Sequence, residues 1–314
     1  MALSLRDKEI QAAERSRKSA EQGDAAAQLN LGRCYAKGEG VEKDPDKAAY
    51  WFMKAAEQGD VTAQKTLGVC YFDGNGVEKD NDKSIYWFRK AAEQGNAFAQ
   101  YSLGVLYKSG EEAVYWYRKA AEQGNAPSQK NLGWCYANGE GVEKDQNKAV
   151  YWYTKSAEQG NALAQLYLGR CYARGEGVEK DLDKAVCWFT KAAEKGNADA
   201  QYILGVRYAR GEGVEKDQDK AAYWLTKAAE RGYAKAQTYL GVRYAGGEGV
   251  EKDQDKAVYW FTKAAKKGNA DAQLNLGRCY EKGEGVETDQ KKAVYWYKKA
   301  AEKGNAEAQK KIGR

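Results

Sequence analysis

Two stretches of this sequence combine glycines, acids and lysines in a way that could bind an anion or a metal ion. Residues 211–221 and 247–257 both read GEGVEKDQDKA. A glycine-rich loop with a lysine can cradle phosphate, and a loop with several carboxylates can bind calcium. The stretch lacks the G-K-[ST] ending of a phosphate loop and the D-x-D-x-D alternation of a calcium loop. We therefore interpret it as a turn, and its recurrence 36 residues later indicates an internal repeat.

Side chains that catalyse reactions or hold metal ions are scarce in this chain. There is no histidine, the commonest general base and a common metal ligand. No G-x-S-x-G or S-x-x-K motif is present, and no two cysteines form a C-x-x-C pair. We therefore predict a protein that is not an enzyme and has no catalytic residue, no cofactor and no metal site. The six cysteines are predicted to be free thiols in a reducing compartment.

The composition is that of a helical protein with a small positive charge. Of 314 residues, 43% are hydrophobic and 31% are charged, and the only prolines are Pro45 and Pro127. The net charge of +6 is small for this length and, spread evenly, indicates no particular partner. No apolar run approaches the ~18 residues of a membrane helix, and the start, MALSLRDKEIQ, has no apolar signal region. We therefore predict a cytoplasmic location.

A repeat of 36 residues explains the duplicated turn. The stretch AEQG, or a close variant, ends at nine glycines that are 36 residues apart except for one gap of 29: Gly23, Gly59, Gly95, Gly124, Gly160, Gly196, Gly232, Gly268 and Gly304. Such self-similarity is typical of solenoids, in which each unit packs on its neighbours. We predict a single solenoid domain over residues 1–314. It comprises an N-terminal capping helix (1–23), eight helix-pair repeats (24–304), of which the third is shortened (96–124), and a C-terminal half-repeat (305–314).

Each unit carries the start and stop signals of two helices. In the sixth unit, Asn197 can cap a first helix whose apolar residues recur at helical spacing. Gly205 lies in the middle of this helix, where glycine costs roughly 1 kcal/mol relative to alanine, and we expect it to allow a close helix–helix approach. Gly211 ends the first helix, and Asp217 caps the second. The stretch GEGVEKD is therefore predicted to be a turn between two antiparallel helices.

These residues resemble the Sel1-like repeat family, whose members are relatives of tetratricopeptide repeat proteins. The resemblance rests on A-x-x-L-G-x-x-Y and G-x-G-V-x-x-D-x-x-K-A-x-x-W-x-x-K-A-A-E-x-G, which recur along nearly the whole chain. It implies an all-α, right-handed superhelical solenoid of antiparallel helix pairs. It also implies a role as an adaptor or scaffold for other proteins rather than as a catalyst. In the sixth unit the matching residues are Ala200, Leu204, Gly205, Tyr208, Gly211, Gly213, Val214, Asp217, Lys220, Ala221, Trp224, Lys227, Ala228, Ala229, Glu230 and Gly232.

Six positions of the first helix vary between units, and we call the face that they form the variable face. In the sixth unit they are Asp199, Tyr202, Ile203, Val206, Ala209 and Arg210. Helical geometry places them opposite the apolar stripe, and in tetratricopeptide-like stacks that face lines a concave groove. Over eight units these positions carry eleven basic residues against four acids, with several aromatic residues among them. The predicted partner-binding residues are Arg33, Phe98, Tyr101, Lys130, Trp134, Leu166, Arg170, Arg174, Tyr202, Arg210 and Arg278.

Two features of the variable face have more than one interpretation. Tyr167, Ile203 and Tyr239 lie at its flank and either line the groove or pack against the next unit. The short turn of the third unit, around Ser109, is either a neutral deletion in a surface loop or a change of pitch or notch where a partner docks. Trp134 is assigned to the groove, because arginine or valine takes its place in every other unit.

A basic face with aromatic residues suits an acidic, partly extended polypeptide, because arginine pairs with carboxylates and rings cover apolar side chains. We therefore predict a non-enzymatic scaffold whose groove binds an acidic or extended segment of a partner protein, with no membrane partner. Three alternatives remain: a hydrolase of cell-wall or β-lactam substrates, as proposed for some proteins of the family; a protein that binds single-stranded nucleic acid by base stacking; and an idealised repeat array without an evolved partner. Nucleic acid is less favoured, since acids are interleaved with the basic residues.

Overall fold

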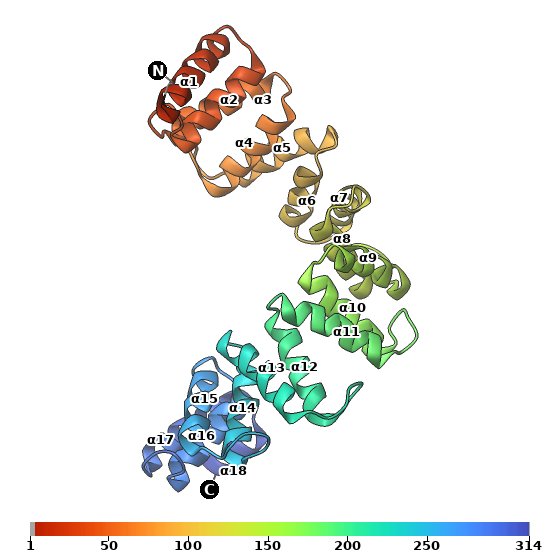
Figure 1. Cartoon of the computed structure of the whole chain (residues 1–314), viewed down its shortest axis with the longest axis vertical. Helices are drawn as coiled ribbons and strands as arrows, with labels where there is room; N and C mark the ends of the chain where they lie inside the picture. Colours follow the sequence, from red (N-terminus) through yellow and green to blue (C-terminus); the bar gives the residue numbers. More distant parts are fainter. Residues whose placement is uncertain (1–3, 314) are drawn as a thin grey trace. The chain divides into compact units, whose positions relative to one another are not determined.

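The computed structural model describes residues 4–313, which form 18 helices packed as consecutive pairs (Figure 1). The predicted all-α solenoid of helix pairs is confirmed. The first helices of the eight repeats are α2 (Ala25–Lys37), α4 (Val61–Asp73), α6 (Ala97–Leu106), α8 (Ala126–Asn138), α10 (Ala162–Arg174), α12 (Ala198–Arg210), α14 (Ala234–Gly246) and α16 (Ala270–Lys282). The second helices are α3 (Pro45–Glu57), α5 (Asn81–Glu93), α7 (Glu111–Glu122), α9 (Gln146–Glu158), α11 (Leu182–Glu194), α13 (Gln218–Glu230), α15 (Gln254–Lys266) and α17 (Gln290–Glu302).

The described chain forms two compact units, which divide between Lys155 and Ser156. The N-terminal unit begins with α1 (Leu5–Glu21), and the C-terminal unit ends with α18 (Ala306–Ile312). Within residues 4–313, no helix is both long enough and apolar enough to cross a membrane. That the repeats behave as one solenoid domain stays a prediction.

Hydrogen bonds at the helix ends explain why each repeat forms two helices. The Asn197 side chain accepts a hydrogen bond from a first-turn backbone N–H of α12, and Gly211 ends this helix in the left-handed region with φ of 74°. Asp217 caps α13 in the same way by accepting from the backbone N–H of Lys220 at 2.9 Å. The N–H of Asp217 donates to the carbonyl of Tyr208, which closes the GEGVEKD segment. The predicted turn is therefore confirmed.

The glycine in the middle of each first helix lets the second helix approach closely. A Cβ atom on Gly205 would lie 2.7 Å from Cγ of Leu225 and 3.2 Å from the carbonyl oxygen of Ala221. In the fifth repeat, Gly169 faces the buried ring of Phe189 in the same way. The side chain that follows the repeated tryptophan therefore fills the space above the glycine, and the close approach expected at Gly205 is confirmed.

The third repeat departs from this pattern at its turn. Helix α6 has 10 residues, whereas the first helices on either side of it, α4 and α8, have 13. Lys108 follows it in the left-handed region with φ of 62°, and Gly110 precedes α7. In the described chain, no side chain caps the first turn of α7. The shortened loop thus removes both the last turn of the first helix and the aspartate cap of the second.

Candidate binding surface

Large apolar side chains are exposed at variable positions of the first helices in both units. In the N-terminal unit they are Phe72, Phe98, Val105 and Trp134, and in the C-terminal unit Leu163 and Val242. Each is between 41% and 47% exposed. Exposed apolar residues that occur singly are common, but adjacent ones mark interaction sites. The adjacent ones in this chain lie on α4 and α6.

An apolar pocket of about 290 Å³ lies between α4 and α6 in the N-terminal unit, and we call it the α4–α6 pocket. Phe88 of α5 is buried and contributes to its wall, with its ring centroid 6.3 Å from that of Phe98. Two predicted binding residues, Phe98 and Tyr101, therefore lie together at one site. The full lining consists of Val69, Phe72, Asp73, Phe88, Phe98, Tyr101, Ser102, Val105 and Leu106.

The pocket occurs where two departures from the repeat coincide. Phe72 stands at a position that alanine takes in five other repeats, for example Ala173 and Ala209. In the next repeat, α6 ends at Leu106, so it has no helical residue at that position. A larger side chain on α4 and a shorter neighbouring helix therefore meet at the same place.

Two lysines lie beside the exposed rings of the pocket. The Lys65 Nζ is 5.7 Å from the ring centroid of Phe98, and the Lys79 Nζ is 5.4 Å from that of Phe72. Both are cation–π distances. Neither lysine forms a salt bridge within residues 4–313. One carboxylate, that of Asp73, lines the pocket itself.

Trp134 and Lys130 lie one helical turn apart on α8. The Trp134 side chain is exposed, and its indole N–H donates to Glu140 Oε2 at 3.2 Å. Lys130 is half-buried and donates to the side-chain oxygen of Asn131. Burial lowers the pKa of Lys130, because it penalises the charged ammonium. Both residues lie on the variable face, as predicted, and so does the exposed Arg33 of α2.

Arg170 joins neighbouring repeats within the C-terminal unit. Its guanidinium forms a salt bridge of 2.6 Å with Asp199 of α12. The Tyr233 hydroxyl, at the start of α14, donates to the other Asp199 oxygen at 2.7 Å. Burial first, and then this bond to a carboxylate, raise the pKa of Tyr233. Arg170 is thus already paired with the chain's own acid, which weakens its assignment as a partner-binding residue.

Leu166 does not lie on the accessible surface. It is 2% exposed and belongs to a core cluster with Phe189 and Leu204, so its assignment as a partner-binding residue is corrected. Tyr202 is half-buried, with its ring 5.3 Å from that of Tyr233 and 6.3 Å from that of Tyr239. Tyr202 therefore packs against the next repeat, to which Tyr233 and Tyr239 belong.

The predicted arginines near the C-terminal helix ends also have acidic partners. Arg174 and Arg210 are exposed and pair with loop glutamates two residues later, Glu176 and Glu212, at 3.5 and 3.4 Å. Such exposed pairs contribute about 0–1 kcal/mol each and can exchange partners. These arginines therefore remain accessible to a carboxylate from another molecule.

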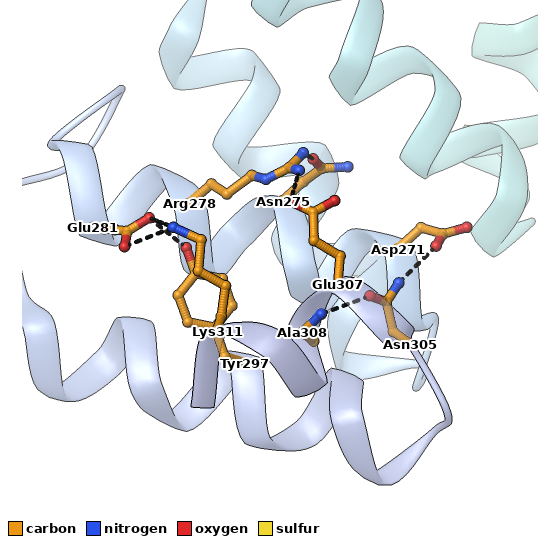
Figure 2. A network of polar contacts seen from close by, with 9 residues as sticks. All are labelled: Asp271, Asn275, Arg278, Glu281, Tyr297, Asn305, Glu307, Ala308 and Lys311. Carbon is orange, nitrogen blue, oxygen red and sulfur yellow. Dashed lines mark hydrogen bonds and ion pairs between the residues drawn. The ribbon is translucent and has the colours of Figure 1, made fainter. Parts of the chain in front are cut away.

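Helices α16, α17 and α18 share a polar network that includes Arg278 (Figure 2). Arg278 of α16 forms a salt bridge with Glu307 of α18, and Lys311 of α18 pairs with Glu281 of α16 at 2.7 Å. Lys311 and the Tyr297 hydroxyl, which donates at 2.8 Å, lower the pKa of Glu281. The network fastens the short terminal helix to α16, so Arg278 has a structural partner.

The variable face is less positively charged than the residues at its six positions alone indicate, because acids from outside these positions lie beside it. Six of its eleven basic residues form salt bridges, five of them with acids outside the six variable positions of the eight repeats. The basic excess of these positions is therefore partly compensated by neighbouring acids of the chain. Within the described chain, five basic residues of the face form no salt bridge, and four of these lie in the N-terminal unit: Arg33, Lys65, Lys108, Lys130 and Lys235.

A row of exposed tyrosines on the second helices was not singled out from the sequence. Each stands directly before the repeated tryptophan and contacts its ring edge-on, with centroids about 5 Å apart, as for Tyr223 and Trp224 at 4.9 Å. Lysines four residues later cover several of these rings, such as Lys227 over Tyr223 at 5.7 Å. The fifth repeat has the exposed Cys187 at this position. The sequence signal for these tyrosines is their recurrence at one position of the repeat. Their ring contacts are with tryptophans and lysines of the same helix.

The cysteines are free thiols in the described chain: Cys70, Cys135, Cys171 and Cys279 of the first helices are buried, Cys34 is partly buried, and Cys187 is exposed. Burial raises the pKa of Cys70, Cys135 and Cys171 to about 11, so these thiols are protonated at neutral pH. No group of three or more metal-binding side chains occurs within residues 4–313.

Comparison with known proteins gives consistent matches over the repeats. The family model described as Sel1 repeat matches residues 25–60, 61–96, 97–125, 126–161, 162–197, 198–233, 234–269 and 270–305. The solved structure of c5321, a protective antigen present in uropathogenic Escherichia coli strains and displaying an SLR fold, is 39% identical with a TM-score of 0.86. That match covers 96% of this chain and 66% of the other, so this chain spans just under two thirds of that protein's length. A Sel1 repeat protein from Oxalobacter formigenes is 36% identical with a TM-score of 0.79, over 96% of this chain and 90% of that chain. No curated protein matches the chain.

Proposed function

The chain belongs to the Sel1 repeat family, and from this premise we propose that it is a non-enzymatic scaffold that holds an acidic or extended segment of a partner protein. Proteins of this family commonly mediate interactions between proteins. The observation that carries the proposal is the set of exposed apolar and aromatic side chains on the variable face, at positions that differ between repeats. An exposed tryptophan at such a position contributes little to the core packing of the solenoid, so binding of another molecule explains it better.

The charges of the variable face support an acidic partner. In the N-terminal unit, Arg33, Lys65, Lys108 and Lys130 form no salt bridge within the described residues. Arginine and lysine at such positions pair with carboxylates, and rings beside them cover apolar side chains of the same segment. Trp134 lies next to Lys130 and is the aromatic anchor that we assign to this contact.

A photo-crosslinking experiment tests this proposal. A benzophenone amino acid at position 134 is expected to crosslink a defined partner protein from cells that express the chain. The same residue at position 151 is the matched control, because Tyr151 is also an exposed aromatic but lies on the second helix α9. Crosslinking of the same proteins from both positions, or of none from position 134, would count against the variable face as the binding surface.

The cellular location also belongs to the proposal. The free thiols in the first helices, Cys70 and its equivalents, suit a reducing compartment, and we propose the cytoplasm. Labelling of accessible thiols in intact and lysed cells tests this, because a periplasmic chain would be labelled at Cys187 before lysis.

A further inference from the structure

We infer that the α4–α6 pocket receives one large apolar side chain, aromatic or leucine-like, that has carboxylates next to it in the partner's segment. This inference rests on the proposed function and deepens it, because it assigns a residue class to one place on the variable face. The pocket lies wholly within the N-terminal unit and is formed by α4, α5 and α6.

The walls of the pocket set the apolar part of this specificity. Phe72, Phe98 and Val105 are exposed around an opening whose wall includes the buried ring of Phe88. A volume of about 290 Å³ is at the lower end of ligand pockets, which suits one side chain rather than a folded element. Covering these surfaces removes apolar area from water on both partners, which is the main favourable term in association.

The lysines at the rim of the pocket determine the charge that is preferred in the bound segment. Lys65 and Lys79 each lie over one of the two exposed phenyl rings and form no salt bridge within residues 4–313. An apolar side chain in the pocket brings the flanking residues of its segment towards these ammonium groups. Carboxylates at those flanking positions would pair with the two lysines. The pocket lining itself contains one acid, Asp73.

The departures from the repeat pattern indicate that the pocket is a binding site and not only a gap in the packing of the helices. Phe72 replaces the alanine of five other repeats, and Phe98 replaces aspartate or other small or polar residues of most repeats. Both residues remain more than 40% exposed, so each leaves apolar surface open to solvent. Adjacent exposed rings of this kind are typical of binding sites.

The test uses fluorescein-labelled nonapeptides and the full chain, with fluorescence anisotropy as the measurement. The reference peptide has a central phenylalanine between pairs of glutamates. Replacing its phenylalanine by alanine is expected to weaken binding by about tenfold or more. Replacing its glutamates by lysines is expected to abolish measurable binding, and the affinity of the reference peptide is expected to fall with rising salt.

Matched variants of the protein locate the contact. Phe98→Ala is expected to weaken binding of the reference peptide by at least about fivefold, whereas Leu163→Ala, at the same repeat position in the C-terminal unit and 43% exposed against 47%, leaves it within about twofold. Val105→Ala and Val242→Ala form a second pair of one residue type at one repeat position. These side chains are exposed, and circular dichroism checks that each variant folds.

Three results would overturn the inference. The first is equal binding of the phenylalanine and alanine peptides, or no binding of the reference peptide at all. The second is an equal effect of Phe98→Ala and Leu163→Ala, which would leave the variable face as a binding surface without this pocket. The third is tighter binding of a labelled oligothymidine at the pocket, lost in Phe98→Ala, which would assign the rings to base stacking. Crosslinking from position 134 does not depend on the pocket, so it judges the proposed function separately.

Discussion

Gln58 at the end of α3 donates from Nε2 to Oε1 of Gln28 on α2 at 2.8 Å, and Gln28 in turn donates to the carbonyl of Ala20 on α1 at 3.1 Å. The relay joins three successive helices through one buried amide. Gln94 and Gln64 repeat it at 2.8 Å. From the fifth repeat onward the donor position is taken by basic residues, Lys195, Arg231, Lys267 and Lys303. Within the described chain, the buried Oε1 atoms of Gln165, Gln201, Gln237 and Gln273 have no hydrogen-bond partner.

The missing relay predicts a stabilising substitution. Lys267→Gln would place an amide donor opposite the unpaired Oε1 of Gln237. The bond that Lys267 donates to the Gly232 carbonyl is kept if the new amide acts as Gln94 does, which donates both to Gln64 and to the Gly59 carbonyl. We expect the free energy of unfolding to rise by about 1 kcal/mol, because a buried acceptor gains a hydrogen bond. Urea unfolding measures it. The neighbouring Lys266→Gln removes the same charge without meeting an acceptor and serves as the control; an equal gain from both would point to charge alone.

The mid-helix glycines predict opposite effects for two Gly→Ala changes. Gly205→Ala is expected to destabilise by roughly 1–3 kcal/mol, because its Cβ would lie 3.1 Å from the backbone nitrogen of Leu225 and force α12 and α13 apart. Gly246→Ala, at the end of α14, meets nothing closer than 3.7 Å and should stabilise by up to about 1 kcal/mol. Thermal unfolding of the two variants compares them. A Gly205→Ala protein as stable as the wild type would show that the helix pair can relax.

The aspartates that cap the second helices predict a loss of stability in acid. The backbone N–H of Lys220 is the main cause that lowers the pKa of Asp217, and its ammonium adds to this. A carboxyl with a lowered folded pKa stabilises above its unfolded pKa of about 3.9, and this contribution is lost as the pH falls through the folded value. The stability difference between wild type and Asp217→Asn should therefore be largest near pH 6 and shrink below about pH 4. Denaturant titrations at several pH values measure it, and a constant difference would contradict the cap.

A buried tyrosine predicts a loss of stability in alkali. Burial raises the pKa of Tyr117 to about 12, above the value near 10 of an unfolded chain. The protonated phenol is favoured in the folded state, so its contribution is full below about pH 10 and is lost as the pH rises towards 12. Tyr117→Phe should therefore lose less stability than the wild type between pH 10 and 12, while the two proteins differ by a constant amount between about pH 7 and 9. Parallel loss in both proteins would contradict it.

The thiols predict a single fast reaction with a disulfide reagent. At pH 8, Cys187 should react first, because it is exposed, whereas burial keeps Cys171 and Cys279 protonated with pKa values of about 11. Absorbance of the released thiolate follows the reaction. Cys187→Ser should remove the fast phase, and a fast phase that persists would place a second accessible thiol on the surface.

Local chemistry made most of the fold predictable from the sequence. Asn197, Asp217 and Gly211 act within one turn of their own position, so residue type alone indicates where helices begin and end. The 36-residue period then predicts the repeat unit and shows which units pack against each other. The same reasoning was too coarse for the binding surface, because six positions cover a wide arc of the helix. The edge of that arc meets the next repeat, which is why Leu166 is buried while Leu163, three residues earlier, is exposed.

Contacts between repeats were beyond the sequence pattern. Arg170 and Asp199 are 29 residues apart, and helical spacing within one repeat says nothing about such a pair. The turn motif alone indicates no partner for its glutamates, whereas in the structure Glu176 and Glu212 lie beside arginines of the variable face. The pocket likewise depends on three helices. In the sequence Phe72 and Phe98 are unrelated aromatic residues of two repeats, and only the structure shows that they line one pocket.

The uncapped start of α7 bears on how the chain acquires its structure. Starting a helix is the costly step, and a side chain that satisfies the first amides lowers that cost. Since α7 has no such side chain within the described residues, it is poorly suited to nucleate by itself. Ordering in the N-terminal unit would then spread to α7 from its neighbours α6 and α8, whose first turns are capped by Asn96 and Asn125.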